Sequence, residues 1–115
     1  MPGPEITVTP AQGTYSIRAQ GAVLGETSSA LILREGDLKP VIYIPRGDLQ
    51  MVFFDRSETT THCPHKGDAS YFHLAGKSRQ EKDVAWSYEN PLKSVAEIKD
   101  HLAFYPDHVT VEAVS

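Results

Sequence analysis

The chain has 115 residues, which suits one domain of ordinary size and is too short for two independent catalytic domains. Hydrophobic residues make up 40% and charged residues 23%, a balance that argues against intrinsic disorder. The chain has 11 Lys and Arg residues against 15 Asp and Glu residues, so its net charge of -4 predicts no nucleic-acid partner. We expect a single domain over residues 1–115, with residues 1–13 as a candidate loose leader.

Cysteine usage and hydropathy indicate the compartment. Cys63 is the only cysteine, which excludes an intramolecular disulfide and a zinc site built from several thiolates. No stretch approaches the ~20 apolar residues of a membrane span, and the N-terminus lacks the apolar run of a signal peptide. We therefore expect a cytoplasmic protein with no membrane partner and no cofactor, and we leave open whether it forms a homo-oligomer.

Short strands separated by turn residues are predicted in the first half of the chain. Val41 to Ile44 form a β-branched and aromatic run that ends at Pro45, which has no N–H to donate. In residues 50–54, apolar residues occupy both the odd and the even positions, which face opposite sides of a strand. This strand is therefore expected to be covered on both faces or to contain a bulge. The strands predicted in this half are 5–9, 15–19, 22–24, 27–34, 41–44 and 50–54.

The second half opens with a polar run at 57–62 and a turn at 63–68. The clearest strand is 84–88, where strict alternation places Val84, Trp86 and Tyr88 on one face. Val95, Ile98 and Leu102 recur at helical spacing and predict one or two helical turns between residues 91 and 101. The other predicted elements are strands at 71–74, 103–105 and 109–113 and a charged hairpin loop at 76–83. Together these elements predict a mainly β fold of two small antiparallel sheets with one short helix.

The turn from His62 to Asp68 contains five ionisable side chains in seven residues. It holds two imidazoles, a thiol, an ammonium and a carboxylate, and Pro64 and Gly67 force the backbone to bend among them. The N–H groups of such a turn can point at an anion. Since packing alone does not require so many ionisable groups in one turn, the sequence predicts a functional site here.

Two motifs resemble those of a known family. The first is Cys-Pro-x-Lys-Gly within residues 61–71, and the second is Ala-Trp-x-Tyr within 85–91, followed by 95–98 and 103–105. They resemble the bacterial domain-of-unknown-function family 427 over about residues 43–109. The resemblance implies a β-tent fold similar to that of methionine sulfoxide reductase B and implies no reaction. The motif positions present here are Tyr43, Cys63, Lys66, Gly67, Asp68, Tyr71, Trp86, Tyr88 and Glu89.

Two properties associated with the family do not carry over to these residues. Relatives of this fold that keep a structural zinc use two Cys-x-x-Cys motifs, whereas Cys63 stands alone here, so no metal site is expected. A nucleotidyltransferase-like label also finds no support, because the chain lacks the Gly-Ser signature that precedes paired metal-binding carboxylates in such enzymes.

The expected site joins the turn to the strand that carries Trp86 across a common hollow. Lys66 and the N–H groups of the turn would hold an anionic part of a ligand, aromatic rings would stack on it, and Asp68 or Glu89 would move protons. The candidate catalytic residues are Cys63, Lys66, Asp68 and Glu89. The candidate ligand-binding residues are Tyr43, Arg46, Lys66, Tyr71, Trp86 and Tyr88.

We interpret the chain as a small-molecule-binding domain and leave open whether it catalyses a reaction. One alternative is a thiol-dependent enzyme in which Lys66 and protonated His62 or His65 activate Cys63, although a lone cysteine is more often a small buried hydrophobe. A second alternative is a non-catalytic protein-interaction module with an exposed aromatic face. A metal site at His62, Cys63 and His65 has poor geometry, because adjacent residues rarely point into one tetrahedron.

Overall fold

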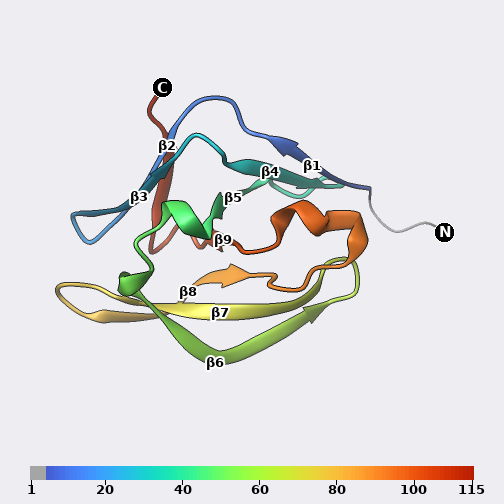
Figure 1. Ribbon diagram of the computed structural model, residues 1–115. Coiled ribbons are helices and arrows are strands. Elements are labelled where there is room, and N and C mark those ends of the chain that lie inside the picture. The colour runs from blue at the N-terminus through green and yellow to red at the C-terminus, as the bar shows by residue number, and fades with distance from the viewer. Residues whose placement is uncertain (1–4) are drawn as a thin grey trace.

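The computed structural model describes residues 5–115, and over these residues ten strands form two antiparallel sheets (Figure 1). The strands are β1 (Ile6–Pro10), β2 (Tyr15–Ala19), β3 (Ala22–Thr27), β4 (Leu31–Glu35), β5 (Val41–Pro45), β6 (Phe54–Cys63), β7 (Gly67–Ala75), β8 (Gln80–Ser87), β9 (His101–Phe104) and β10 (Thr110–Ala113). Three 3₁₀-helices, η1 (Arg46–Asp48), η2 (Met51–Phe53) and η3 (Lys93–Ile98), complete the described elements. The predicted mainly β class, with two antiparallel sheets and a short helical segment, is confirmed.

The two sheets differ in size. The larger one has seven strands in the order β1-β4-β5-β9-β8-β7-β6, and the smaller one has the order β10-β2-β3. Figure 1 shows the large sheet bent, with β1 and β4 above, β6 and β7 below, and η3 in the space between them. This bend places the β4–β5 end of the sheet opposite β7 and β8.

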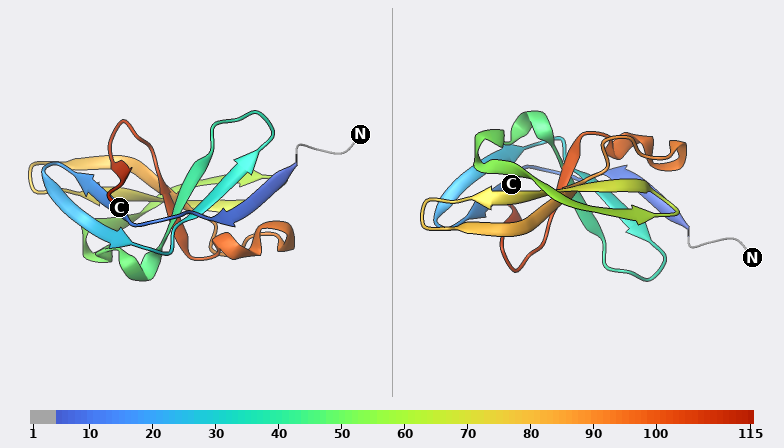
Figure 2. Two further views of the ribbon diagram at one scale, coloured as in Figure 1. Left: turned by 90° about the horizontal axis from the view of Figure 1, so that it is seen from above. Right: turned by 90° about the horizontal axis from the view of Figure 1, so that it is seen from below.

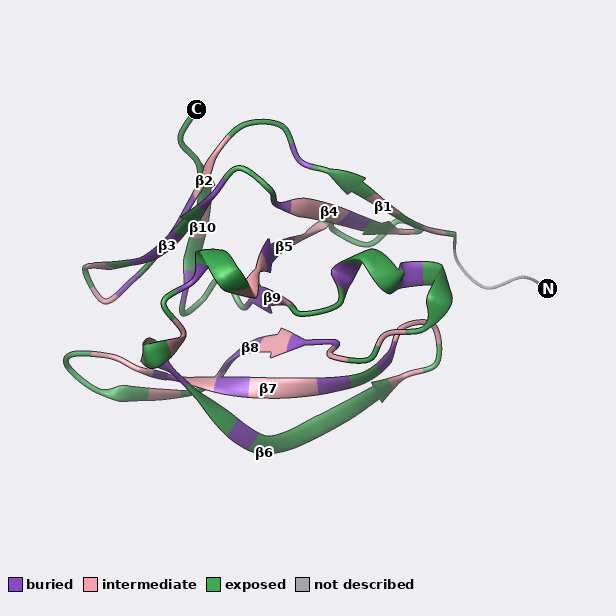
Figure 3. Cartoon of the chain, in the orientation of Figure 1, coloured by how far each residue is buried: buried purple, intermediate pink, exposed green. Residues whose placement is uncertain are grey.

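The first hydrophobic core lies between the small sheet and the central strands of the large sheet. Ile17 of β2, Leu24 of β3, Ile44 of β5 and Val84 of β8 are at most 2% exposed. Burial of each such side chain contributes about 1.5–3 kcal/mol to the folded state. Figure 3 shows the burial concentrated on the inner strands, whereas β6 at the edge is mostly exposed.

The second core fills the bend of the large sheet, and η3 closes it. Two short helical turns make up η3 and meet at a kink at Val95. Val95 and Ile98 are both fully buried and pack with Leu33, Tyr43 and Ala103. The helical turns predicted between residues 91 and 101 are thus present. The third residue of that periodic pattern, Leu102, is an exception, because it lies in β9 and packs in the first core.

Four predicted elements differ from the structure, and three of them lie at residues 27–34, 51–53 and 76–83. Residues 51–53 form η2 instead of a strand, since the N–H groups of Phe53 and Phe54 bond back to Gln50 and Met51. The predicted strand 27–34 is broken, because the chain passes between the two sheets after β3 and resumes as β4. The hairpin loop 76–83 is shorter than predicted, because β8 begins at Gln80 and pairs with β7.

The fourth difference is the polar run 57–62, which belongs to β6. Among the described strands this one lies at the edge of the large sheet, beside β7. Its residues are mostly exposed, so it carries no alternation of apolar and polar side chains that would have predicted a strand.

The segment predicted as a candidate leader, residues 1–13, divides into two parts. Residues 1–4 lie outside the described residues. Residues 6–10 form β1, which pairs with β4 over its full length, and Ala11 is 6% exposed in the first core. From residue 6 onward this segment is therefore part of the fold. Within residues 5–115, no helix is long and apolar enough to cross a membrane.

Candidate functional site

The turn predicted at residues 63–68 joins β6 to β7 as a tight hairpin. Cys63 pairs with Gly67 across the two strands, and the Lys66 N–H donates to the Cys63 carbonyl at 3.1 Å. Gly67 adopts φ +112°, a backbone conformation that residues with a Cβ rarely adopt. The Lys66 carbonyl accepts a hydrogen bond from the Leu92 N–H at 3.0 Å, which ties the turn to the segment before η3. This geometry fixes the backbone from which the Lys66 side chain extends.

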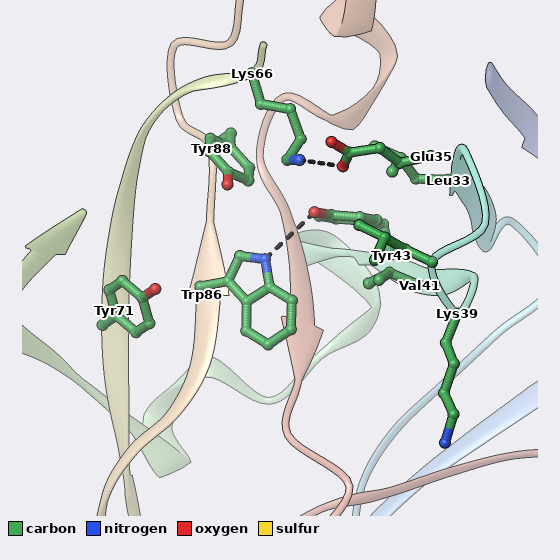
Figure 4. A pocket seen from close by; sticks show the side chains of 10 residues that line it. Leu33, Glu35, Lys39, Val41, Tyr43, Lys66, Tyr71, Trp86 and Tyr88 are labelled. Atoms are coloured by element: carbon green, nitrogen blue, oxygen red, sulfur yellow. Dashed lines mark hydrogen bonds and ion pairs between the residues drawn. The ribbon is translucent and has the colours of Figure 1, made fainter. Parts of the chain in front are cut away.

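A cavity of about 200 Å³ lies between this turn, the β4–β5 end of the large sheet, and strands β7 and β8 (Figure 4). Ten residues line it: Leu33, Glu35, Leu38, Lys39, Val41, Tyr43, Lys66, Tyr71, Trp86 and Tyr88. The turn and the strand that carries Trp86 therefore line one cavity.

An ion pair between Lys66 and Glu35 lies at one end of the cavity. The Lys66 Nζ donates to Glu35 Oε1 at 2.7 Å, and the two side chains are only 12% and 14% exposed. Burial by itself lowers the pKa of the Lys66 ammonium, but the hydrogen bond to Glu35 and nearby groups outweigh that effect, so the pKa lies above its usual value. Lys66 is therefore charged at neutral pH and already has a carboxylate partner.

Aromatic side chains form the wall next to this ion pair. The Trp86 Nε1–H donates to the Tyr43 hydroxyl at 3.3 Å, and the Trp86 ring packs against Tyr105 with 4.7 Å between ring centroids. Burial raises the pKa of Tyr43 to about 12, and burial likewise raises the pKa of Tyr88. Both phenols keep their protons at neutral pH. Figure 4 shows the Lys66 ammonium and the Tyr88 hydroxyl directed toward the interior of the pocket.

The remaining candidate residues lie outside the set that lines the cavity. Asp68 has an 84% exposed side chain, and its Oδ1 accepts a hydrogen bond from His62 Nδ1 at 2.7 Å. Cys63 packs against the second core and is partly buried. Of the groups that were expected to activate the Cys63 thiol, Lys66 pairs with Glu35 and His62 hydrogen-bonds to Asp68.

Glu89 forms a separate cluster with two arginines. Arg56 Nη2 donates to Glu89 Oε2 at 2.6 Å, and Arg46 Nη2 donates to the same oxygen at 2.9 Å. The pKa of Glu89 is held at about 2. The hydrogen bond from Arg56 has the largest effect, and the hydrogen bond from Arg46 adds to it, whereas partial burial opposes them by raising the pKa. Both guanidinium groups also lie over the Phe72 ring, that of Arg46 at 5.3 Å and that of Arg56 at 5.2 Å from the ring centroid. A carboxylate held this firmly in its ionised form is poorly suited to donate a proton at neutral pH.

The cavity includes residues that the sequence reasoning missed, namely Leu33, Glu35, Leu38, Lys39 and Val41. One signal was available for two of them. Leu33 and Glu35 are two residues apart in a strand and so share a face, which places the carboxylate beside a core position. Leu38 and Lys39 lie in the loop between β4 and β5, where no periodic pattern exists.

Within residues 5–115, no three His, Cys, Asp or Glu side chains are grouped so that they could hold a metal ion. No curated protein matches the chain. The family model NTP_transf_9, described as "Domain of unknown function (DUF427)", matches residues 7–115. This match covers most of the chain and includes every residue of the cavity, so the protein belongs to the DUF427 family.

Proposed function

We propose that this domain binds a small molecule in the cavity between β4–β5 and β7–β8. The observation that carries the proposal is the Lys66–Glu35 ion pair, which lies almost buried at the wall of a cavity lined by aromatic rings. Withdrawing two charges from water is costly, and replacing such a pair by apolar residues is often neutral or stabilising. A polar pair facing a cavity is better explained by recognition of a ligand than by fold stability.

The charge balance of the pair defines which ligand atoms fit it. The Lys66 ammonium has three N–H groups, of which one bonds to Glu35, and the Glu35 carboxylate has further acceptor sites. A head group with one acceptor and one donor, such as a carboxamide, satisfies both partners at once. A free anion would be attracted by the Lys66 ammonium but repelled by the Glu35 carboxylate. The anion-holding role expected for Lys66 therefore becomes one of binding an uncharged polar group.

The aromatic wall favours a flat ligand. Trp86 is held by its hydrogen bond to Tyr43 and by its contact with Tyr105, so its ring is positioned before any ligand arrives. Stacking on such a ring adds about 0.5–1.5 kcal/mol beyond the burial of area, and a fixed ring loses little entropy on binding. Tyr43 and Tyr88 supply protonated hydroxyls nearby.

The proposal is tested by a thermal-shift screen of small planar amides, imides and carboxylates against the wild-type chain and Lys66→Met. A molecule that binds only the folded state raises the melting temperature by mass action. We expect planar amides to stabilise the wild type and to have no effect on Lys66→Met, whereas the control Lys77→Met, which alters an exposed lysine outside the cavity, responds as the wild type does.

Two outcomes would contradict the proposal. If no compound shifts either protein, the cavity is not a small-molecule site and the protein-interaction alternative is favoured. If compounds stabilise the wild type and Lys66→Met equally, they bind elsewhere on the domain. The thiol-dependent alternative is tested in the same samples by labelling with iodoacetamide, since a reactive Cys63 would be alkylated faster than free cysteine at neutral pH.

A further inference from the structure

A second hollow adjoins the cavity and has a different character. It measures about 300 Å³ and is lined mainly by apolar side chains from β5, β8, β9 and β10 and from the loops between β4 and β5 and between β9 and β10. We call it the apolar groove. Its lining residues are Lys39, Pro40, Val41, Ile42, Trp86, Phe104, Pro106, Val109 and Val111.

The cavity and the apolar groove share three lining residues, Lys39, Val41 and Trp86. In Figure 4 the ring nitrogen of Trp86 faces Tyr43, and its six-membered ring points away from the Lys66–Glu35 pair. One side chain therefore contributes to a polar compartment and to an apolar one.

Two loops border the groove. The loop between β4 and β5 carries Lys39 and Pro40, and the loop between β9 and β10 carries Pro106 and Val109. In both views of Figure 2 these loops, teal and red respectively, project on the same side of the molecule, and η3 lies on the opposite side. The groove thus lies where two loops flank one face, a position accessible from solvent.

The sizes of the two compartments favour joint occupation. Cavities that hold small ligands commonly measure about 300–1,000 Å³, so the cavity alone falls below that range and the groove lies at its lower limit. Taken together they fall inside it. A molecule bound in the cavity alone would leave the apolar groove in contact with water. A molecule bound in the groove alone would leave the Lys66–Glu35 pair without a ligand partner.

We propose that the ligand is amphipathic, with a flat polar head in the cavity and an aliphatic tail in the apolar groove. This inference rests on the proposed function and adds to it the class of the ligand. The head hydrogen-bonds to Lys66 and Glu35, Trp86 contacts the point where head and tail join, and the tail packs against Ile42, Phe104 and Val111.

The test compares benzamide, which has the head alone, with 4-pentylbenzamide, which has the same head and a tail. Binding is followed by the fluorescence of Trp86, the single tryptophan of the chain. We expect the tail to improve affinity by about tenfold or more, because it removes several methylene groups from water.

Variants in the groove separate the tail from the head. Val111→Thr keeps the shape of a partly buried side chain and adds a hydroxyl, and Pro106→Asp places a charge at an exposed groove position. Both variants should reduce the advantage of 4-pentylbenzamide over benzamide to about threefold or less, while benzamide itself binds as it does to the wild type. The matched control Val23→Thr lies outside both hollows and should retain the full advantage.

The outcomes distinguish this inference from the proposed function. If benzamide binds and the tail adds nothing, or if the tail's advantage survives both groove variants, the amphipathic ligand is excluded while the cavity remains a binding site. If neither compound binds, the inference is overturned as well, and the thermal-shift screen with Lys66→Met then decides the proposed function separately.

Discussion

The ammonium of Lys66 and the carboxylate of Glu35 meet at 2.7 Å although 31 residues separate them in the chain. Lys66 comes from the β6–β7 turn and Glu35 from the last position of β4, and the bend of the large sheet brings these two ends together. The ion pair thus links the two halves of the sheet at one end of the cavity.

Removing either partner of this pair should destabilise the fold. Breaking a fully buried pair costs about 3–5 kcal/mol, and the small exposure of both side chains to the cavity reduces the expected loss to about 2–3 kcal/mol. We expect Lys66→Met and Glu35→Gln each to lower the free energy of unfolding by this amount in urea titrations.

The double variant distinguishes a true pair from two independent effects. Lys66→Met combined with Glu35→Gln should lose clearly less than the two single losses added together, because no uncompensated charge is then left. Lys77→Met should change stability by no more than about 0.5 kcal/mol. Strict additivity of the two substitutions would show that the pair does not couple the sheet halves.

Acid stability should depend on Glu89. Its pKa is held at about 2 in the folded state, by Arg56 first and Arg46 second, whereas a free glutamate titrates near pH 4.3. A depressed pKa contributes stability above the unfolded value and loses it as the pH falls toward about 2. After allowance for solvent screening, the contribution amounts to about 1–2 kcal/mol.

The measurement for Glu89 is the free energy of unfolding at pH 5 and at pH 2.5. Glu89→Gln should reduce the difference between these two pH values relative to the wild type. Glu58→Gln, which alters an exposed carboxylate in β6, serves as the control and should leave the difference unchanged. If the Glu89→Gln variant lost as much unfolding free energy between pH 5 and pH 2.5 as the wild type, the contribution of Glu89 and its two arginines to acid stability would be contradicted.

How far the sequence predicts this site depends on the type of signal. Strict alternation in residues 84–88 indicated that Trp86 and Tyr88 share a face, and both line the cavity. It did not show that Ala85 and Ser87 are also fully buried, because β8 is covered on both faces by the two cores and by neighbouring strands. Local patterns reveal which side chains face together but not what lies opposite them.

The long-range partners could not be predicted in this way. Glu35 directly precedes Gly36 and Asp37, which are residue types common in turns, and only the bend of the large sheet places it against Lys66. Glu89 likewise looked free for proton transfer, although Arg46 and Arg56 approach it from other elements. Whether Cys63, Asp68 or Glu89 takes part in catalysis stays a prediction.

Alkaline stability should depend on Tyr43. Burial raises its pKa to about 12, so the folded state favours the neutral phenol more strongly than the unfolded state does. Such a raised pKa contributes about 2–3 kcal/mol to the free energy of unfolding. This contribution is complete below pH 10 and is lost as the pH rises toward 12. Tyr43→Phe should show a smaller fall in unfolding free energy between pH 9.5 and 11.5 than the control Tyr15→Phe; equal falls would contradict this assignment.

The turn that carries Lys66 should require glycine at position 67. With φ at +112°, an alanine there is strained and should cost about 1–3 kcal/mol in thermal or urea unfolding. Gly47→Ala is the matched control, since a Cβ at that position would meet open space and its φ is not in the strained region. A Gly67→Ala variant as stable as Gly47→Ala would show that the turn has another conformation.

The proposed ligand binds beside Lys66, Glu35 and Trp86. The most direct measurement is a two-dimensional ¹H–¹⁵N NMR titration of the labelled chain with benzamide, in which the single tryptophan contributes one indole N–H signal. We predict that this signal and the backbone signals of Lys66 and Glu35 move together and saturate, while that of Lys77 stays in place. Saturating shifts confined to residues far from the cavity, or no shifts at all, would contradict the account.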